Sequence, residues 1–107
     1  METISFDDFK KLEIRIGKII SAEKIESSHK LLQLQVDFGT EKRQILAGIA
    51  KYYTPENLVG KLCPFVFNLE PKKLGDLESQ GMILAADGEG PVLMHPDKEI
   101  LPGSIVK

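Results

Sequence analysis

Residues 32–47 read LQLQVDFGTEKRQILA, and this stretch decides the fold class. Apolar side chains alternate with polar ones, at Leu32, Leu34, Val36 and Phe38. A period of two is typical of a strand that is buried on one face. Gly39-Thr40 then turns the chain, and residues 42–47 follow at turn distance. The stretch therefore predicts a β-hairpin.

Upstream of the hairpin, the sequence predicts one short helix and one strand. Ser5 can cap a helix whose first turn carries Asp7 and Asp8, and we expect this helix to end near Leu12. Residues 13–25 alternate and are rich in β-branched side chains, which favours a strand. Gly17 interrupts this strand and indicates a bulge or a sharp bend.

Downstream of the hairpin, Thr54-Pro55 is a helix-start signal and Gly60 is a stop signal. The apolar run 62–69 predicts a buried strand, and 82–86 predicts another. A turn cluster separates the second of these from two short terminal strands. The turn cluster is residues 87–91, and the two terminal strands are residues 92–94 and 105–106.

Three strands, a short helix and two strands follow one another in the order of an OB-fold. We therefore expect an all-β protein: a five-stranded OB-fold Greek-key barrel with a short helix between strands 3 and 4. An N-terminal helix and a C-terminal strand would extend it, and residues 1–107 would form a single domain. A small SH3-like barrel or a β-sandwich also explains many short strands.

The net charge of −2 argues against a nucleic-acid partner, because such partners favour a basic protein. The charge is uneven, however: residues 30–82 carry seven basic and six acidic side chains. No apolar run is long enough to span a membrane, and we identify no signal peptide at the N-terminus. The single cysteine fits a cytoplasmic protein.

Signals for catalysis and for metal binding are weak. The sequence has no glycine-rich phosphate loop and no nucleophile-elbow motif. His29 and His95 lack partners at metal-ligand spacing. Cys63 lies in an apolar run, which favours a small buried side chain over a reactive thiolate. We therefore expect no catalytic residue, no cofactor and no metal.

Residues 68–82 are the most unusual segment, because polar and basic side chains join two apolar strands. Lysines can meet phosphates, amides and hydroxyls can contact 2′-OH groups or base edges, and a methionine can pack on an exposed base. Side chains of these kinds in the segment include Asn68, Lys72, Lys73, Ser79 and Met82. A solvated loop with Met82 in the core is the alternative interpretation.

Seven stretches together resemble a family of tRNA-binding OB domains, and they cover nearly the whole chain. The family includes the C-terminal domain or beta subunit of methionyl-tRNA synthetase, free-standing bacterial tRNA-binding proteins and eukaryotic synthetase-associated cofactors. The stretches are EIRIGKI (13–19), HKLL (29–32), EKRQI (41–45), AGIA (47–50), YTPENLVGK (53–61), NLEPKKL (68–74) and ESQGMILAA (78–86).

The resemblance implies that the chain binds tRNA by shape and forms a homodimer, joined through its N-terminal helix and C-terminal strands. The catalytic chain of methionyl-tRNA synthetase is a further expected partner. The residues that match family positions for tRNA are Lys30, Arg43, Lys72, Lys73, Ser79 and Met82. The chain departs from the family at His29, where Asp is frequent, at Ala47, where Ser is frequent, and at Lys72, where Arg is usual.

Two other functions stay open. One branch of the same superfamily resembles dimeric secretion chaperones that take unfolded chains in apolar pockets. A purely structural dimerisation module would fit the weak positive charge of residues 30–82. The paired lysines and the S-x-G-M spacing favour the tRNA branch.

Overall fold

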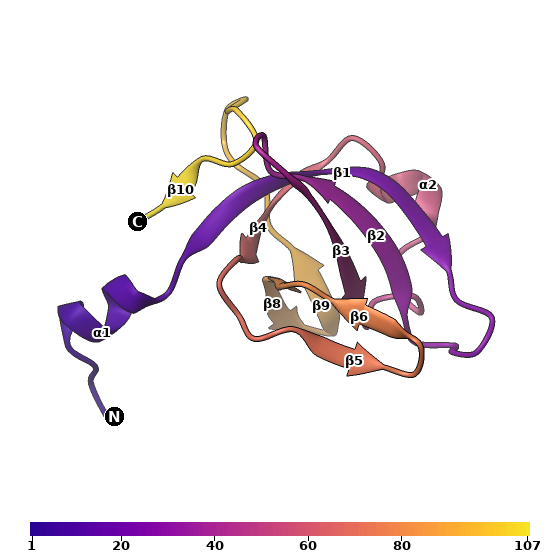
Figure 1. The fold of residues 1–107 in the computed structure, drawn as a ribbon, viewed down its shortest axis with the longest axis horizontal. Coiled ribbons are helices and arrows are strands. Elements are labelled where there is room, and N and C mark those ends of the chain that lie inside the picture. The colour runs from indigo at the N-terminus through magenta and orange to yellow at the C-terminus, as the bar shows by residue number, and fades with distance from the viewer.

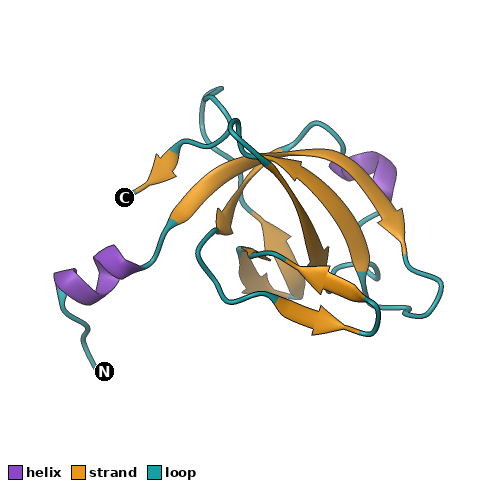
Figure 2. Ribbon diagram, in the orientation of Figure 1, coloured by secondary structure: helices purple, strands orange, loops and turns teal.

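The computed structural model describes residues 1–107 as a strongly curved antiparallel sheet with small hairpins attached to it (Figures 1 and 2). The helices are α1 (Phe6–Lys11) and α2 (Pro55–Leu58). The strands are β1 (Ile14–Lys24), β2 (Leu32–Asp37), β3 (Lys42–Ala47), β4 (Leu62–Val66), β5 (Lys72–Leu74), β6 (Leu77–Ser79), β7 (Met82–Ile83), β8 (Ala85–Gly88), β9 (Gly90–Leu93) and β10 (Ile105–Val106).

The main sheet has the strand order β3-β2-β1-β4-β7, and β10 pairs with β1. This half-barrel, with α2 between β3 and β4, is the predicted OB-fold. The predicted count of five strands is not reproduced: the main sheet has six strands, since β10 joins it, and the expected strand 82–86 divides into β7 and β8 at Leu84. The backbone N–H of Leu84 donates to the carbonyl oxygen of Pro64 at 3.0 Å, and β8 leaves the sheet to pair with β9.

The predicted hairpin 32–47 is confirmed, with β3 at its predicted bounds and β2 ending at Asp37, one residue before Phe38. Side chains of β2 alternate between buried and half-buried, as the period of two requires. Three rings meet below this hairpin: Phe38 lies edge-on to Phe65 and Phe67, at centroid distances of 5.4 and 5.0 Å. The barrel core therefore forms on the inner face of the strands that the alternation identified.

The irregularity in β1 is not at Gly17, where we predicted it. The register against β2 shifts between Ile19 and Ser21. Gly17 instead lets two core side chains approach the strand, because a Cβ there would lie 2.4 Å from Val36 Cγ1 and 2.7 Å from Phe38 Cε1. The sequence correctly indicated that this position requires glycine, and the physical reason is close packing.

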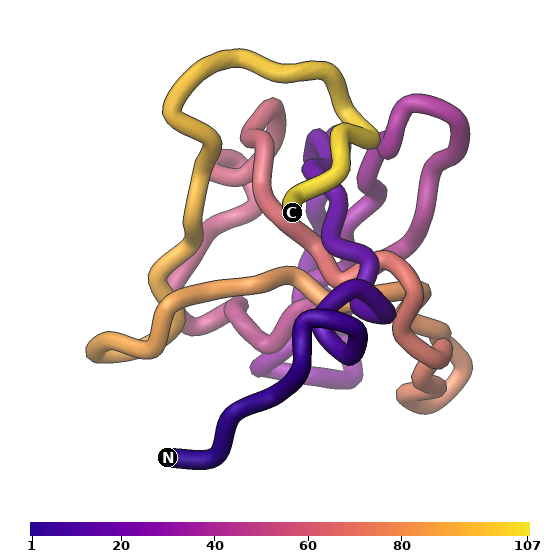
Figure 3. The backbone as a smooth tube through the Cα atoms, turned by 90° about the vertical axis from the view of Figure 1, so that its left-hand side faces the viewer, coloured from indigo at the N-terminus to yellow at the C-terminus, as the bar shows by residue number.

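The chain ends lie apart from the barrel interior. Helix α1 has the predicted Ser5 cap, whose Oγ accepts from Asp8 N at 3.0 Å, but none of its residues is buried. It stands clear of the sheet at the end where the C-terminus also lies (Figures 1 and 3). Thr54 precedes α2 without a side-chain capping bond. Neither helix has the length and apolar character needed to cross a bilayer.

We expect Gly17→Ala to lower the free energy of unfolding by about 1–3 kcal/mol, because the added methyl group overpacks the core against Val36 and Phe38. Urea unfolding followed by circular dichroism measures this change. Gly48→Ala is the matched control, since a Cβ there would meet nothing within 4 Å. Equal stability of the Gly17→Ala variant and the wild type would contradict the packing role.

Candidate nucleic-acid interface

The last residue of β6 and the segment that follows it close the barrel against β3, partly through their side chains. Ser79 is buried, and its Oγ accepts from Leu46 N at 3.0 Å and donates to the carbonyl oxygen of Gly81 at 2.9 Å. Gln80 N donates to the Gln44 carbonyl at 2.9 Å, and Gln80 Oε1 accepts from Gln44 N at 3.0 Å. Side-chain oxygens thus replace the carbonyls that a regular strand would offer to β3.

Gly81 is needed for this closure. Its φ of +148° is a conformation that side chains rarely adopt, and a Cβ would lie 2.8 Å from the carbonyl oxygen of Val66. After Gly81 the chain joins β4 through the pairing of Val66 with Met82. The motif Ser-Gln-Gly-Met therefore turns the chain from one side of the barrel to the other.

Arg43 supports the same closure. Its Nη1 donates to the carbonyl oxygens of Phe67 and Gln80, and its Nε donates to Glu41 at 2.9 Å. The guanidinium carbon lies 3.5 Å from the centre of the Phe67 ring, and that of Arg15 lies 4.2 Å from it. Phe67 is thus held by two cation–π contacts. Only 20% of the Arg43 side chain is exposed, so most of its hydrogen-bonding capacity serves the protein itself.

Lys72 and Lys73 lie on an ordered hairpin, which corrects the expectation of an open loop. β5 pairs with β6, so that Lys72 is opposite Ser79 and Lys73 is opposite Glu78. Both lysines are exposed. Adjacent residues of a strand point to opposite faces, so the two ammonium groups face different sides of the hairpin. The hairpin therefore presents two separate cationic positions.

Asn68 lies before the hairpin, where the segment after β4 meets the chain between α1 and β1. Its Oδ1 accepts from Glu13 N at 2.8 Å, and its Nδ2 donates to the carbonyl oxygen of Lys11 at 2.6 Å. These two bonds tie the chain between α1 and β1 to the segment after β4. Asn68 thus has a structural bonding role, and it lines a small pocket together with Arg43, Pro71 and Gln80.

Met82 and Lys30 are both exposed, and Met82 is outside the core with 46% of its surface exposed. The loop that carries Lys30 is fixed to the segment after β3, because Ala50 N donates to the carbonyl oxygen of Lys30 at 3.0 Å. That segment exposes Lys51 and Tyr52, which the sequence analysis did not single out. The sequence could have indicated these two residues as an RNA contact, because a basic residue stands next to an aromatic one.

Cys63 is buried, and desolvation raises the pKa of its thiol to about 11, although the charge of Lys61 acts in the opposite direction. The thiol is therefore protonated at neutral pH. His95 Nδ1 lies 2.8 Å from the carbonyl oxygen of Leu62 and 3.6 Å from the sulfur. No group of three or more metal-ligating side chains occurs in the structure.

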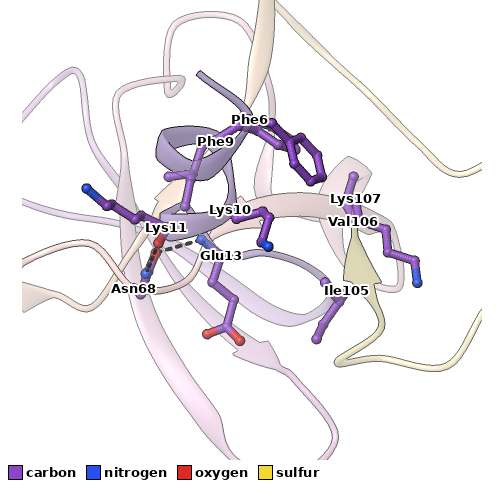
Figure 4. A pocket seen from close by; sticks show the side chains of 10 residues that line it. Phe6, Phe9, Lys10, Lys11, Glu13, Asn68, Ile105, Val106 and Lys107 are labelled. Atoms are coloured by element: carbon purple, nitrogen blue, oxygen red, sulfur yellow. Dashed lines mark hydrogen bonds between the residues drawn. The ribbon is translucent and has the colours of Figure 1, made fainter. Parts of the chain in front are cut away.

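An apolar groove of about 720 Å³ lies between α1 and β10 (Figure 4). Phe6 and Phe9 enter it from the helix, with their ring centroids 6.4 Å apart. Ile105 and Val106 line the opposite side, and Asn68 lies at its base. The groove is far richer in exposed apolar surface than the hairpin that carries Lys72 and Lys73.

Comparisons with known proteins agree on one family. The model of the family described as "Putative tRNA binding domain" matches residues 14–105. Methionine–tRNA ligase of Archaeoglobus fulgidus is 53% identical over 106 residues, or 98% of this chain, and that of Thermotoga maritima is 56% identical over 104 residues, or 96% of it. The chain spans only 16% of the length of each of these relatives.

Two solved structures are similar over almost their entire length. The crystal structure of a MetRS related protein from Pyrococcus horikoshii has a TM-score of 0.93 at 43% identity, with 100% of both chains covered. That of the chaperone CsaA from Bacillus anthracis has a TM-score of 0.89 at 30% identity, covering 99% of this chain and 100% of that one.

We expect Ser79→Ala to lower the free energy of unfolding by about 1–3 kcal/mol, because it leaves the buried Leu46 N–H without an acceptor. Thermal and urea unfolding measure the loss. Ser27→Ala, at an exposed serine, is the control and should leave stability unchanged. If the two variants were equally stable, the Ser79 hydroxyl would not be part of the barrel closure.

Proposed function

Because the chain belongs to this tRNA-binding domain family, we propose that it binds tRNA by shape and catalyses no reaction of its own. The relatives at 53% and 56% identity are methionine–tRNA ligases. Binding would therefore support aminoacylation in the cytoplasm, beside or attached to the catalytic chain of methionyl-tRNA synthetase. A second contact to the tRNA body raises its local concentration at the catalytic site without any new chemistry.

The observation that carries the proposal is the ordered β5–β6 hairpin next to an exposed methionine. The hairpin holds Lys72 and Lys73 at fixed positions, and Met82 follows β6 by three residues. In Figure 1 the hairpin and the loop that carries Lys30 lie at the end of the barrel opposite the termini. A folded RNA can contact the hairpin and this loop from that side.

The predicted tRNA residues divide into two groups under this proposal. Lys30, Lys72, Lys73 and Met82 are exposed and would contact the RNA. Arg43, Ser79 and Asn68 bond to the protein's own backbone and would position the surface instead. These three residues would thus support RNA binding by fixing the shape of the surface, without contacting the RNA.

Recognition by shape also fits the charges on the hairpin. Glu70, Asp76 and Glu78 lie within the same segment as the two lysines. The segment is therefore not strongly basic, and counterion release alone would give modest affinity. Close contacts to sugars and bases must supply the rest.

The CsaA neighbours make a protein-binding chaperone the second candidate. Titrating the protein with total tRNA and with a chemically unfolded protein, each at two salt concentrations, separates the two functions. Salt-sensitive binding of tRNA alone supports the proposal. Binding of the unfolded protein alone would replace tRNA binding with the chaperone function.

A homodimer is the oligomer we propose, with the groove between α1 and β10 as the contact surface. A helix of six residues that buries nothing is marginal in water, so α1 needs a covering partner. A second copy carries the same apolar side chains, and a two-fold axis would bring each helix onto the other subunit's groove. A purely structural dimerisation module would use this surface alone.

We expect Lys72→Ala/Lys73→Ala to weaken tRNA binding and to flatten its salt dependence. Each lost phosphate contact should lower the slope of log K against log salt by about 0.7–0.9. Fluorescence titrations over a range of salt concentrations measure both quantities. Lys18→Ala/Lys98→Ala removes the same charge from exposed positions outside the proposed surface and should change neither. An unchanged affinity and slope in the first variant would rule out the hairpin as the RNA contact.

The dimer is tested with Phe6→Lys, which places a charge in the groove at a side chain that is 71% exposed. Light scattering at micromolar concentration should give a dimer for the wild type and an 11.9 kDa species for the variant. Val59→Lys, at another exposed apolar position, should remain dimeric. A wild type that is monomeric throughout would refute the proposed contact.

A further inference from the structure

Tyr52 presents an aromatic ring to solvent in a fixed position. Its surface is 56% exposed, and its backbone N–H donates to the carbonyl oxygen of Ile49 at 3.0 Å. One side of the ring lies against Gly90 in the β8–β9 hairpin, where a Cβ would be 2.4 Å from Cε1. Gly90 is therefore the residue that allows the ring to rest there. The hairpin fixes Tyr52 while more than half of its surface stays free.

The next residue, Tyr53, makes the structural hydrogen bonds between this segment and the β8–β9 hairpin. Its hydroxyl donates to the carbonyl oxygen of Pro91 at 3.2 Å and accepts from Leu93 N at 3.1 Å. Tyr53 thus attaches the β8–β9 hairpin to the segment after β3. The hydroxyl of Tyr52 makes no hydrogen bond in the structure, so the barrel does not depend on it.

Two lysines lie close to Tyr52 along the backbone. Lys51 precedes Tyr52, and the backbone bond between Ala50 and Lys30 brings the β1–β2 loop beside the same segment. Both lysines are exposed, as is Glu89 at the tip of the β8–β9 hairpin. With acidic and basic groups both present, a ligand here would gain more from the ring face than from charge.

We infer that Tyr52 is a stacking platform for an unpaired base of the bound RNA, with Lys30 and Lys51 next to the flanking phosphates. This inference rests on the tRNA binding proposed above and names the part of the RNA that this surface takes. Every base has a π-face, so a fixed, exposed ring can hold a splayed-out nucleotide of any sequence. Paired bases inside a helix are not available to it.

The test compares Tyr52→Phe with Tyr52→Leu, because Leu keeps an apolar contact to Gly90 but has no π-face. Binding of tRNA, of a short single-stranded RNA and of a blunt RNA duplex is measured by fluorescence anisotropy. Val59→Ala, at a side chain that is 52% exposed, is the control. Thermal unfolding confirms that each variant is folded. In the protein labelled with 3-fluorotyrosine, ¹⁹F NMR gives separate signals for Tyr52 and Tyr53.

We expect Tyr52→Phe and Val59→Ala to bind as the wild type does. Tyr52→Leu should bind tRNA and single-stranded RNA about fivefold or more weakly, with an unchanged salt slope and unchanged duplex binding. RNA should shift the ¹⁹F signal of Tyr52 and leave that of Tyr53 in place. A Tyr52→Leu variant that binds tRNA as tightly as the wild type overturns the inference while leaving the proposed function intact. The inference is also overturned if Tyr52→Leu loses as much affinity for an unfolded protein as it loses for tRNA. A wild type that binds none of the three RNAs overturns both.

Discussion

The closure of the barrel between β3 and the segment after β6 is the interaction on which the other surfaces depend. Ser79 and Gln80 supply side-chain oxygens to backbone N–H groups of β3, and Gly81 then redirects the chain into β7. Without this closure the edge of β3 would be unpaired and the β5–β6 hairpin would have no fixed base. The hairpin keeps its place because it emerges from residues that the barrel itself holds.

Electrostatics has a secondary role in this arrangement. The two arginines of the chain, Arg15 and Arg43, each pair with a glutamate two residues earlier and rest on Phe67. Their charges are therefore paired within the protein, and the exposed lysines lie among acidic neighbours. The chain can therefore carry a net charge of −2 and still present cationic positions to a phosphate backbone. Geometry, more than total charge, decides where such a backbone fits.

Local patterns predicted the elements well because each depends on neighbours in sequence. Alternation located β2, the turn at Gly39-Thr40 located β3, and the Ser5 cap located α1. Long-range contacts escaped prediction: Gly17 was interpreted as a bulge or a sharp bend, whereas its crowding comes from Val36 and Phe38, 19 and 21 residues away in the sequence. Likewise, a polar serine within a polar segment gave no sign that Ser79 is buried against Leu46. The family resemblance located the motif, and only the structure explained why its serine and glycine are required.

Both chain termini leave the barrel on one side, and the hairpin and the β1–β2 loop lie on the other (Figure 1). This polarity makes the domain easy to tether. A linker joined at either end would extend away from the hairpin and the β1–β2 loop, so a fused enzyme would not shield them. The same layout suits a free-standing copy and one embedded in a longer polypeptide, as in the ligases of which it spans 16%. Evolution could thus move the module between these contexts without redesigning the face that carries the hairpin and this loop.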